Sequence, residues 1–118
     1  MDVTTLDHEQ EIAMRTRRRD GSWSSRPVWV VVVDHDAYVR SYRGTRGDWY
    51  RSAHADGRAE IQVGDDVVPV GLEDVHDDAL NRRVSEAYRD KYAESAPGPT
   101  ESMVGIDARE TTMVLRLP

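Results

Sequence analysis

Residues 28–33, Val28-Trp29-Val30-Val31-Val32-Val33, are the most strongly patterned stretch of this sequence. The stretch is continuously apolar and mostly β-branched, which is typical of a strand that is covered on both faces. Asp34-His35-Asp36 follows directly and predicts a tight hairpin turn. Together the two segments predict a buried strand and a hairpin at the centre of the fold.

Alternating residues on both sides of this stretch predict more strands. Residues 11–19 alternate around Ile12 and Met14, and residues 37–43 alternate with Tyr38 and Arg40 on one face. Pro69 places the fifth strand at a sheet edge or at a bulge, because proline lacks the N–H that an interior strand needs. The six expected strands are residues 11–19, 28–33, 37–43, 59–63, 67–72 and 109–117.

Three helices are expected between and before these strands. Residues 4–10 predict a short helix capped by Thr4 or Thr5, and Asp48 predicts the start of a helix that ends at Gly57. Residues 77–93 predict the longest helix, since their apolar side chains recur every three or four positions. Residues 97–99, Pro-Gly-Pro, predict a mobile loop.

Length and composition limit the architecture. The 118 residues suit one domain, residues 1–118, and fifteen of them are valine. The pattern predicts a mainly β, α+β fold: a small antiparallel barrel of six strands with peripheral helices. The chain has no cysteine, no apolar run long enough to cross a membrane and no visible signal peptide. We therefore expect a cytoplasmic protein without disulfides.

Charge is distributed unevenly along the chain. Residues 1–14 carry a net charge of −4, residues 15–58 carry +5, and residues 59–118 carry −7. Every basic residue but Lys91 is an arginine, whose planar fork suits phosphate and carboxylate. The basic centre indicates either a local site for an anionic ligand or a solvated strand face. Nucleic acid is not an expected partner, because the acidic flanks would repel it.

Several classes of catalytic site lack support in the sequence. His35, His54 and His76 each have an aspartate nearby, but none shows the spacing of a metal site, so no metal is expected. No serine lies in a nucleophile-elbow motif, and no glycine-rich phosphate loop is present.

The remaining candidates surround two loops that a sheet would bring together. Hydroxyl groups and guanidinium forks there are the groups that bind a phosphate. Trp49 either stacks on a planar ligand ring or anchors its own helix in the core. The candidate phosphate ligands are Arg17, Arg19, Ser22, Ser24 and Arg26 at the first loop and Ser41, Arg43 and Gly44 at the second.

The same segments carry a resemblance to a known family. Residues 16–28, with Arg17, Ser22 and Arg26 before the apolar strand, resemble the opening of deazaflavin-dependent nitroreductases. Residues 38–44 resemble the second strand of that family, which ends in a phosphate-binding serine, and residues 49–52, Trp-Tyr-Arg-Ser, resemble its next helix. The chain looks closest to a compact domain-of-unknown-function branch of the flavin-binding split-barrel group.

This resemblance implies a fold, a cofactor and an activity. It implies a split β-barrel and a homodimer that binds FMN or a deazaflavin and acts as an oxidoreductase on a small organic substrate. Arg26 is the phosphate ligand expected to matter most and Arg58 the arginine expected to matter least. Tyr88 and Tyr92 either line the substrate side or only cover the barrel. The alternative is a split barrel without a flavin that binds a small metabolite or catalyses a cofactor-free step such as a cyclisation.

Overall fold

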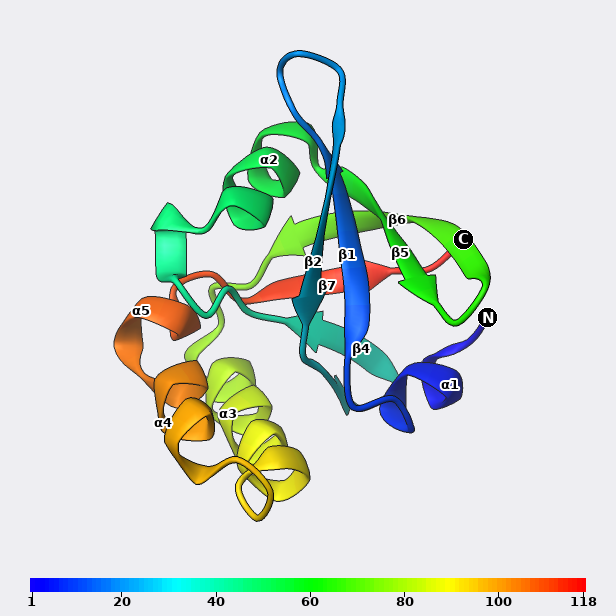
Figure 1. The fold of residues 1–118 in the computed structure, drawn as a ribbon. Coiled ribbons are helices and arrows are strands. Elements are labelled where there is room, and N and C mark those ends of the chain that lie inside the picture. Colours follow the sequence, from blue (N-terminus) through cyan, green and yellow to red (C-terminus); the bar gives the residue numbers. More distant parts are fainter.

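A computed structural model describes residues 1–118 and contains a curled antiparallel sheet with helices around it (Figure 1). The sheet has seven strands in the order β2-β1-β5-β6-β7-β4-β3, and it stays open because β2 and β3 do not pair. The mixed α+β class with an antiparallel sheet is confirmed, but the expected number of six strands is wrong. The strands are β1 (Ile12–Arg17), β2 (Trp23–Val28), β3 (Val30–Val33), β4 (Asp36–Val39), β5 (Arg58–Val63), β6 (Asp66–Asp74) and β7 (Met113–Arg116).

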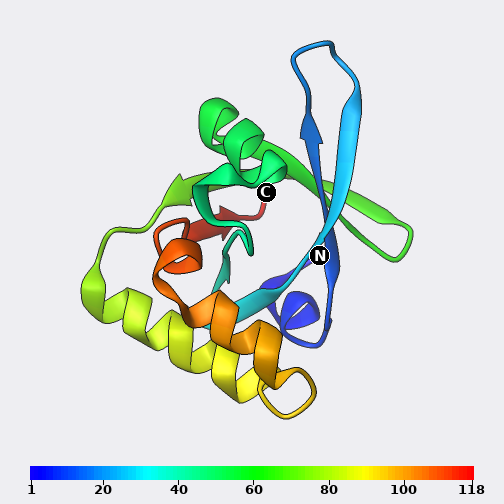
Figure 2. The same ribbon diagram turned by 60° about the vertical axis from the view of Figure 1, so that its left-hand side comes forward.

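The additional strand is β2, most of which the sequence suggested to be a loop. It pairs with β1 from Ile12↔Val28 to Arg17↔Trp23, and the resulting hairpin projects beyond the rest of the sheet (Figures 1 and 2). Its polar composition hid it, since β2 is an edge strand with only Ser24 and Val28 buried. The strand expected over residues 28–33 is divided at Trp29, because β2 ends at Val28 and β3 begins at Val30.

Strand β3 has buried side chains on both of its faces, as the apolar run predicted. Val30 packs inside the curl of the sheet with residues of β1, β5 and β7 and with Trp49. Val31 and Val33 belong to a second cluster, which lies against Val84 and Tyr88 of helix α3 (Asp78–Tyr92). One short strand therefore separates two hydrophobic cores.

Helix α3 also covers the open edge of β3. The hydroxyl of Tyr88 donates to the carbonyl of Trp29 at 3.1 Å. The hydroxyl of Tyr92 donates to the carbonyl of Gln10 at 2.7 Å and lies 3.3 Å from the carbonyl of Val30. The ammonium group of Lys91 donates to the same Val30 carbonyl at 2.7 Å. Side chains thus satisfy backbone acceptors that no neighbouring strand reaches.

The other helices differ from expectation at their ends. Helix α1 (Val3–Asp7) is capped by Asp2, which accepts from the N–H of Thr5, and not by Thr4 or Thr5. Helix α2 (Asp48–Asp56) has Gly47 as its N-cap and ends at Gly57, whose φ of 70° is the expected left-handed stop. The Pro97–Pro99 segment is not a loop but the first turn of helix α4, where proline is tolerated. The remaining elements are α4 (Pro97–Val104), α5 (Ile106–Arg109) and the 3-10 helix η1 (Gly44–Arg46).

Three details of the predicted strands have clear outcomes. The hairpin turn is confirmed, because Asp34 and His35 adopt left-handed conformations between the paired residues Val33 and Asp36. The strand expected over residues 37–43 ends at Val39, and the last strand covers only Met113–Arg116. Pro69 pairs with β5 alone, because β7 joins β6 only from Gly71 onward, so the edge prediction is confirmed locally.

Arg40 follows β4 and is buried between the sheet and the helices, with an exposed fraction of 1%. Its five N–H groups donate to Thr112 Oγ1, Ser85 Oγ, the Met103 carbonyl, and the carbonyl and side-chain oxygens of Asn81, at 2.8–3.3 Å. All five donors of a guanidinium are therefore used, and every acceptor is neutral. Burial lowers the pKa of Arg40 to about 10, so the group still carries its charge near neutral pH.

None of the helices is both long and apolar enough to span a membrane. The cytoplasmic location remains a prediction.

Candidate functional site

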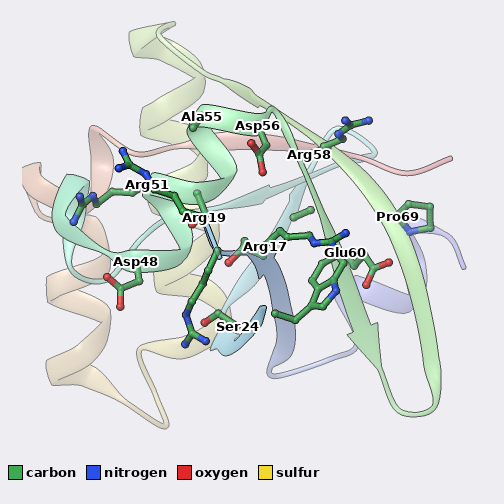
Figure 3. Close-up of a pocket in the computed structure, with 15 residues that line it drawn as sticks. Arg17, Arg19, Ser24, Asp48, Arg51, Ala55, Asp56, Arg58, Glu60 and Pro69 are labelled. Atoms are coloured by element: carbon green, nitrogen blue, oxygen red, sulfur yellow. The ribbon is translucent and has the colours of Figure 1, made fainter. Parts of the chain in front are cut away.

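A cavity of about 830 Å³ lies between the β1–β2 hairpin, helix α2 and strand β5 (Figure 3). We refer to it as the basic cavity, because its lining contains five arginines and three carboxylates. Its volume is within the range of about 300–1,000 Å³ that small-molecule sites occupy. The charged residues that line it are Arg17, Arg18, Arg19, Arg51, Arg58, Asp48, Asp56 and Glu60.

The tip of the hairpin holds the first three arginines next to one another. Asp20 accepts from the N–H of Ser22 at 2.9 Å and from its hydroxyl at 2.6 Å, and these bonds lower the pKa of Asp20. Gly21 has a φ of 88°, a conformation that glycine adopts without strain. The turn therefore has a defined shape, and Arg17 and Arg19 lie on the wall of the cavity that Figure 3 shows.

Trp23 supplies the aromatic part of this wall. The guanidinium groups of Arg15 and Arg17 both lie 5.3 Å from the centre of its ring, a distance at which cations are attracted to aromatic faces. Trp23 still keeps 41% of its surface exposed. The tryptophan thus helps to hold two arginine side chains together at the hairpin.

The opposite wall comes from α2 and from the start of β5. Arg51 projects from the helix, and Arg58 directly follows Gly57, where the chain turns from α2 into the sheet. Arg51 was not among the residues expected from the sequence, and Arg58 was expected to matter least, but both line the basic cavity. No local motif marks either residue, because only the packing of α2 on β1 brings them to the hairpin arginines.

Ser24 has the most informative environment in the cavity. It lies on β2 with an exposed fraction of 5%, and its hydroxyl has no hydrogen-bond partner within the protein. A buried hydroxyl without a partner is energetically unfavourable, so such a group in a native structure points to a missing ligand or water. A hydroxyl can donate to an anionic oxygen, and Ser24 lines the same cavity as the five arginines.

Two other residues predicted at the first loop do not line the cavity. The hydroxyl of Ser22 is engaged with Asp20 at the hairpin tip. Arg26 lies further along β2, with its side chain half exposed and its guanidinium 4.0 Å from the carboxylate of Asp48. Its role as the strongest phosphate ligand stays a prediction.

The second predicted loop lies away from the basic cavity. Ser41 is buried, its hydroxyl is unpartnered, and it lies so close to Gly47 that a Cβ at residue 47 would overlap it. Gly44 packs against the backbone of Asp107 in α5, and Arg43 is exposed beside it. The two loops therefore do not meet around one ligand in this structure.

The three aromatic candidates are all buried. Trp49 has an exposed fraction of 7% and lines a second, smaller cavity with Trp29 and Met103. Tyr88 and Tyr92 belong to the core beneath α3, and their hydroxyls bind backbone carbonyls. Burial raises the pKa of both tyrosines. These contacts favour the second interpretation of Tyr88 and Tyr92, in which they cover the sheet.

Comparison with known proteins gives a family for this fold. Residues 2–115 match the model of a family described as "Uncharacterized protein conserved in bacteria (DUF2255)". The chain belongs to the DUF2255 family. Among curated proteins, none matches the sequence.

Solved structures show that this DUF2255 protein shares its fold with proteins of several functions. A structure described as F420-H2 dependent reductase (FDR-A) has a TM-score of 0.68 at 15% identity, over 92% of this chain and 95% of that one. HutZ, described as a haem storage protein from Vibrio cholerae, has a TM-score of 0.65 at 13% identity, over 98% of this chain and 85% of HutZ. A structure described as a domain-swapped dimer has a TM-score of 0.61 at 13% identity, over 92% of this chain and 81% of that one. The fold resemblance to the deazaflavin reductases is thereby confirmed.

Proposed function

We propose that this DUF2255 protein binds FMN or a deazaflavin coenzyme and acts as an oxidoreductase on a small organic molecule. The observation that carries the proposal is the basic cavity, whose lining contains five arginines and Ser24, a residue with an unpartnered hydroxyl. F420 is a deazaflavin, and the F420-H2 dependent reductase with the same fold supports this cofactor class.

The residues present fit the anionic part of such a coenzyme. Arg17, Arg51 and Arg58 would neutralise a phosphate or carboxylate group, and Ser24 would donate to one of its oxygens. Trp23 offers an aromatic face next to these groups. The bound coenzyme would supply the hydride-transfer chemistry, while the protein positions it and shields it from water.

Titration with FMN and with F420, followed by quenching of tryptophan fluorescence, tests the proposal. We expect Arg17→Ala and Arg51→Ala each to weaken binding by about ten- to a hundred-fold, because each removes a charge-assisted hydrogen bond. Arg82→Ala is the matched control, since Arg82 is exposed on α3 outside the cavity. Arg26→Ala should have a smaller effect than Arg51→Ala, because Arg26 is half exposed beside Asp48.

Two results would count against the cofactor. Failure of both FMN and F420 to bind at about 100 μM would end the oxidoreductase proposal. Equal losses from Arg51→Ala and Arg82→Ala would show diffuse attraction to a basic surface and no formed site. Binding should also weaken as salt increases, because the arginines are partly exposed.

A second candidate function is the binding of a small metabolite, or a cofactor-free step such as a cyclisation, without a flavin. The basic cavity has few apolar residues beside Trp23, namely Ala55, Ala59 and Pro69, and ligand pockets for planar rings are mostly apolar. An absorption band near 370–450 nm in the purified protein supports the flavin-type function, and its absence after reconstitution supports this alternative.

We also propose that the protein is a homodimer. Ile106 keeps 72% of its surface exposed and Trp23 41%, and a contact between two copies of the chain would bury such apolar surface. The domain-swapped dimer with the same fold supports this assembly. Light scattering at about 50 μM should give twice the chain mass of 13.4 kDa, and a monomer at that concentration would contradict the proposal.

A further inference from the structure

A second cavity, of about 230 Å³, lies where the β2–β3 corner meets α2 and α4. It shares no lining residue with the basic cavity. An apolar cavity of about 150 Å³ is known to hold a benzene ring, so this one has room for a single ring with a substituent. We refer to it as the aromatic cavity; its main lining residues are Trp29, Tyr42, Trp49, Met103, Arg40 and Glu11.

The aromatic walls of this cavity are held in fixed orientations. Trp29 stacks on Tyr92 with ring centres 4.0 Å apart and an interplanar angle of 4°. Trp49 meets Tyr50 edge to face at 6.2 Å. Rings that are already packed on one side present a rigid surface on the other, and planar aromatic ligands bind to such surfaces by stacking or edge contacts.

Arg40 gives the aromatic cavity a positive charge that the protein does not balance. Its five N–H groups all bind neutral oxygens, and no carboxylate lies within 4.0 Å of it. The charged groups that act on it most are Arg109 and Arg89, which add to the positive potential. In surroundings of low dielectric constant, an anion in the adjacent cavity would be attracted even without a hydrogen bond to the guanidinium.

We propose that the aromatic cavity binds a small aromatic ring with one negative charge, such as an arene carboxylate. The ring packs against Trp29, Trp49 and Tyr42, and its anionic group is the counter-charge of Arg40. Glu11 is the one carboxylate that lines the cavity, and it is exposed at the rim. It opposes an anionic ligand, which makes it a useful position for a test. The site is independent of the cofactor proposed above.

Calorimetric titration with benzoate and with its neutral analogue benzamide tests this site in the unliganded protein. We expect benzoate to bind about tenfold more tightly than benzamide, because only benzoate compensates the charge of Arg40. Comparing two ligands avoids an Arg40 variant, whose expected loss of stability would interfere with a binding measurement. Equal affinities, or no binding of benzoate at about 10 mM, would overturn the proposal.

Two exposed positions separate the contributions of charge and ring. Glu11→Gln should tighten benzoate binding about two- to five-fold and leave benzamide unchanged, because it removes a repelling carboxylate. Tyr42→Ala should weaken both ligands, since Tyr42 is 58% exposed and forms part of the wall. Glu94→Gln and Ile106→Ala are controls outside the cavity and should change neither affinity. An unchanged benzoate affinity in both Glu11→Gln and Tyr42→Ala would place the ligand elsewhere and overturn the assignment.

Discussion

Arg40→Met should lower the free energy of unfolding by about 3–5 kcal/mol or prevent folding altogether, because it leaves several buried acceptors without a donor. The methionine keeps most of the apolar stem but donates no hydrogen bond. The carbonyl of Met103, the side-chain oxygen of Asn81 and the hydroxyl of Ser85 would then lose their buried donor. Removing the buried charge offsets only part of this loss, because the acceptors placed around it stay behind.

Urea denaturation of Arg40→Met and of the control Arg82→Met measures the effect. Arg82 is exposed on α3, so its substitution should change stability by less than about 0.5 kcal/mol. A midpoint for Arg40→Met equal to that of the control would show that water can replace all five donors. Arg40 would then be dispensable for joining α3 and α4 to the sheet.

Val31→Asp should abolish soluble expression or destabilise the domain by more than about 4 kcal/mol, since it buries a carboxylate without a partner. Val31 is 1% exposed and faces Tyr88 and Val84 in the core beneath α3. No arginine or lysine of that core is free to pair with an aspartate there, because the donors of Arg40 are used.

Val32→Asp provides the matched control for this effect. Val32 lies next to Val31 in β3 but on the opposite face, and it is only partly buried. The aspartate there can reach water, so the soluble fraction and the urea midpoint should fall less than for Val31→Asp. Equal losses would mean that the disruption comes from strand propensity, and that the buried environment of Val31 is unimportant.

Hydrophobic patterns along short segments predicted the buried strand β3 and the long helix α3, but not strand β2 or helix α4. The run from Val28 to Val33 predicted burial on both faces, and the recurring apolar side chains of residues 77–93 predicted helix α3. Strand β2 was missed because its mostly polar residues do not alternate with apolar ones. Its pairing with β1 forms only in the folded protein. Helix α4 was missed because Pro97 and Pro99 read as a loop, although proline fits a first helical turn.

In the candidate site, too, residues that are close in sequence could be grouped in advance, whereas residues brought in by packing could not. Arg17, Arg19 and Ser24 are close in sequence, so their grouping around one loop was visible in the sequence, and all three line the basic cavity. Arg51 and Arg58 reach the same cavity only through the packing of α2, and no spacing rule contains that information.

The burial of Arg40 was equally invisible in the sequence. Its alternation with Tyr38 assigned it to a face, but its acceptors come from residues 81–112, far along the chain. A charged residue is buried only where distant groups supply all its partners, and only the folded structure can show that they do.

The side chains that reach from α3 to β3 affect what becomes exposed when the protein partly unfolds. Tyr88 and Lys91 donate to the carbonyls of Trp29 and Val30, which lie at the start of the free edge of a very apolar strand. When α3 detaches, that edge becomes a template on which another chain can add its own strand. We therefore expect partial unfolding at this helix to promote pairing between chains through β3. Helix α3 thus covers the hydrophobic core and also shields the edge of β3 from pairing with another chain.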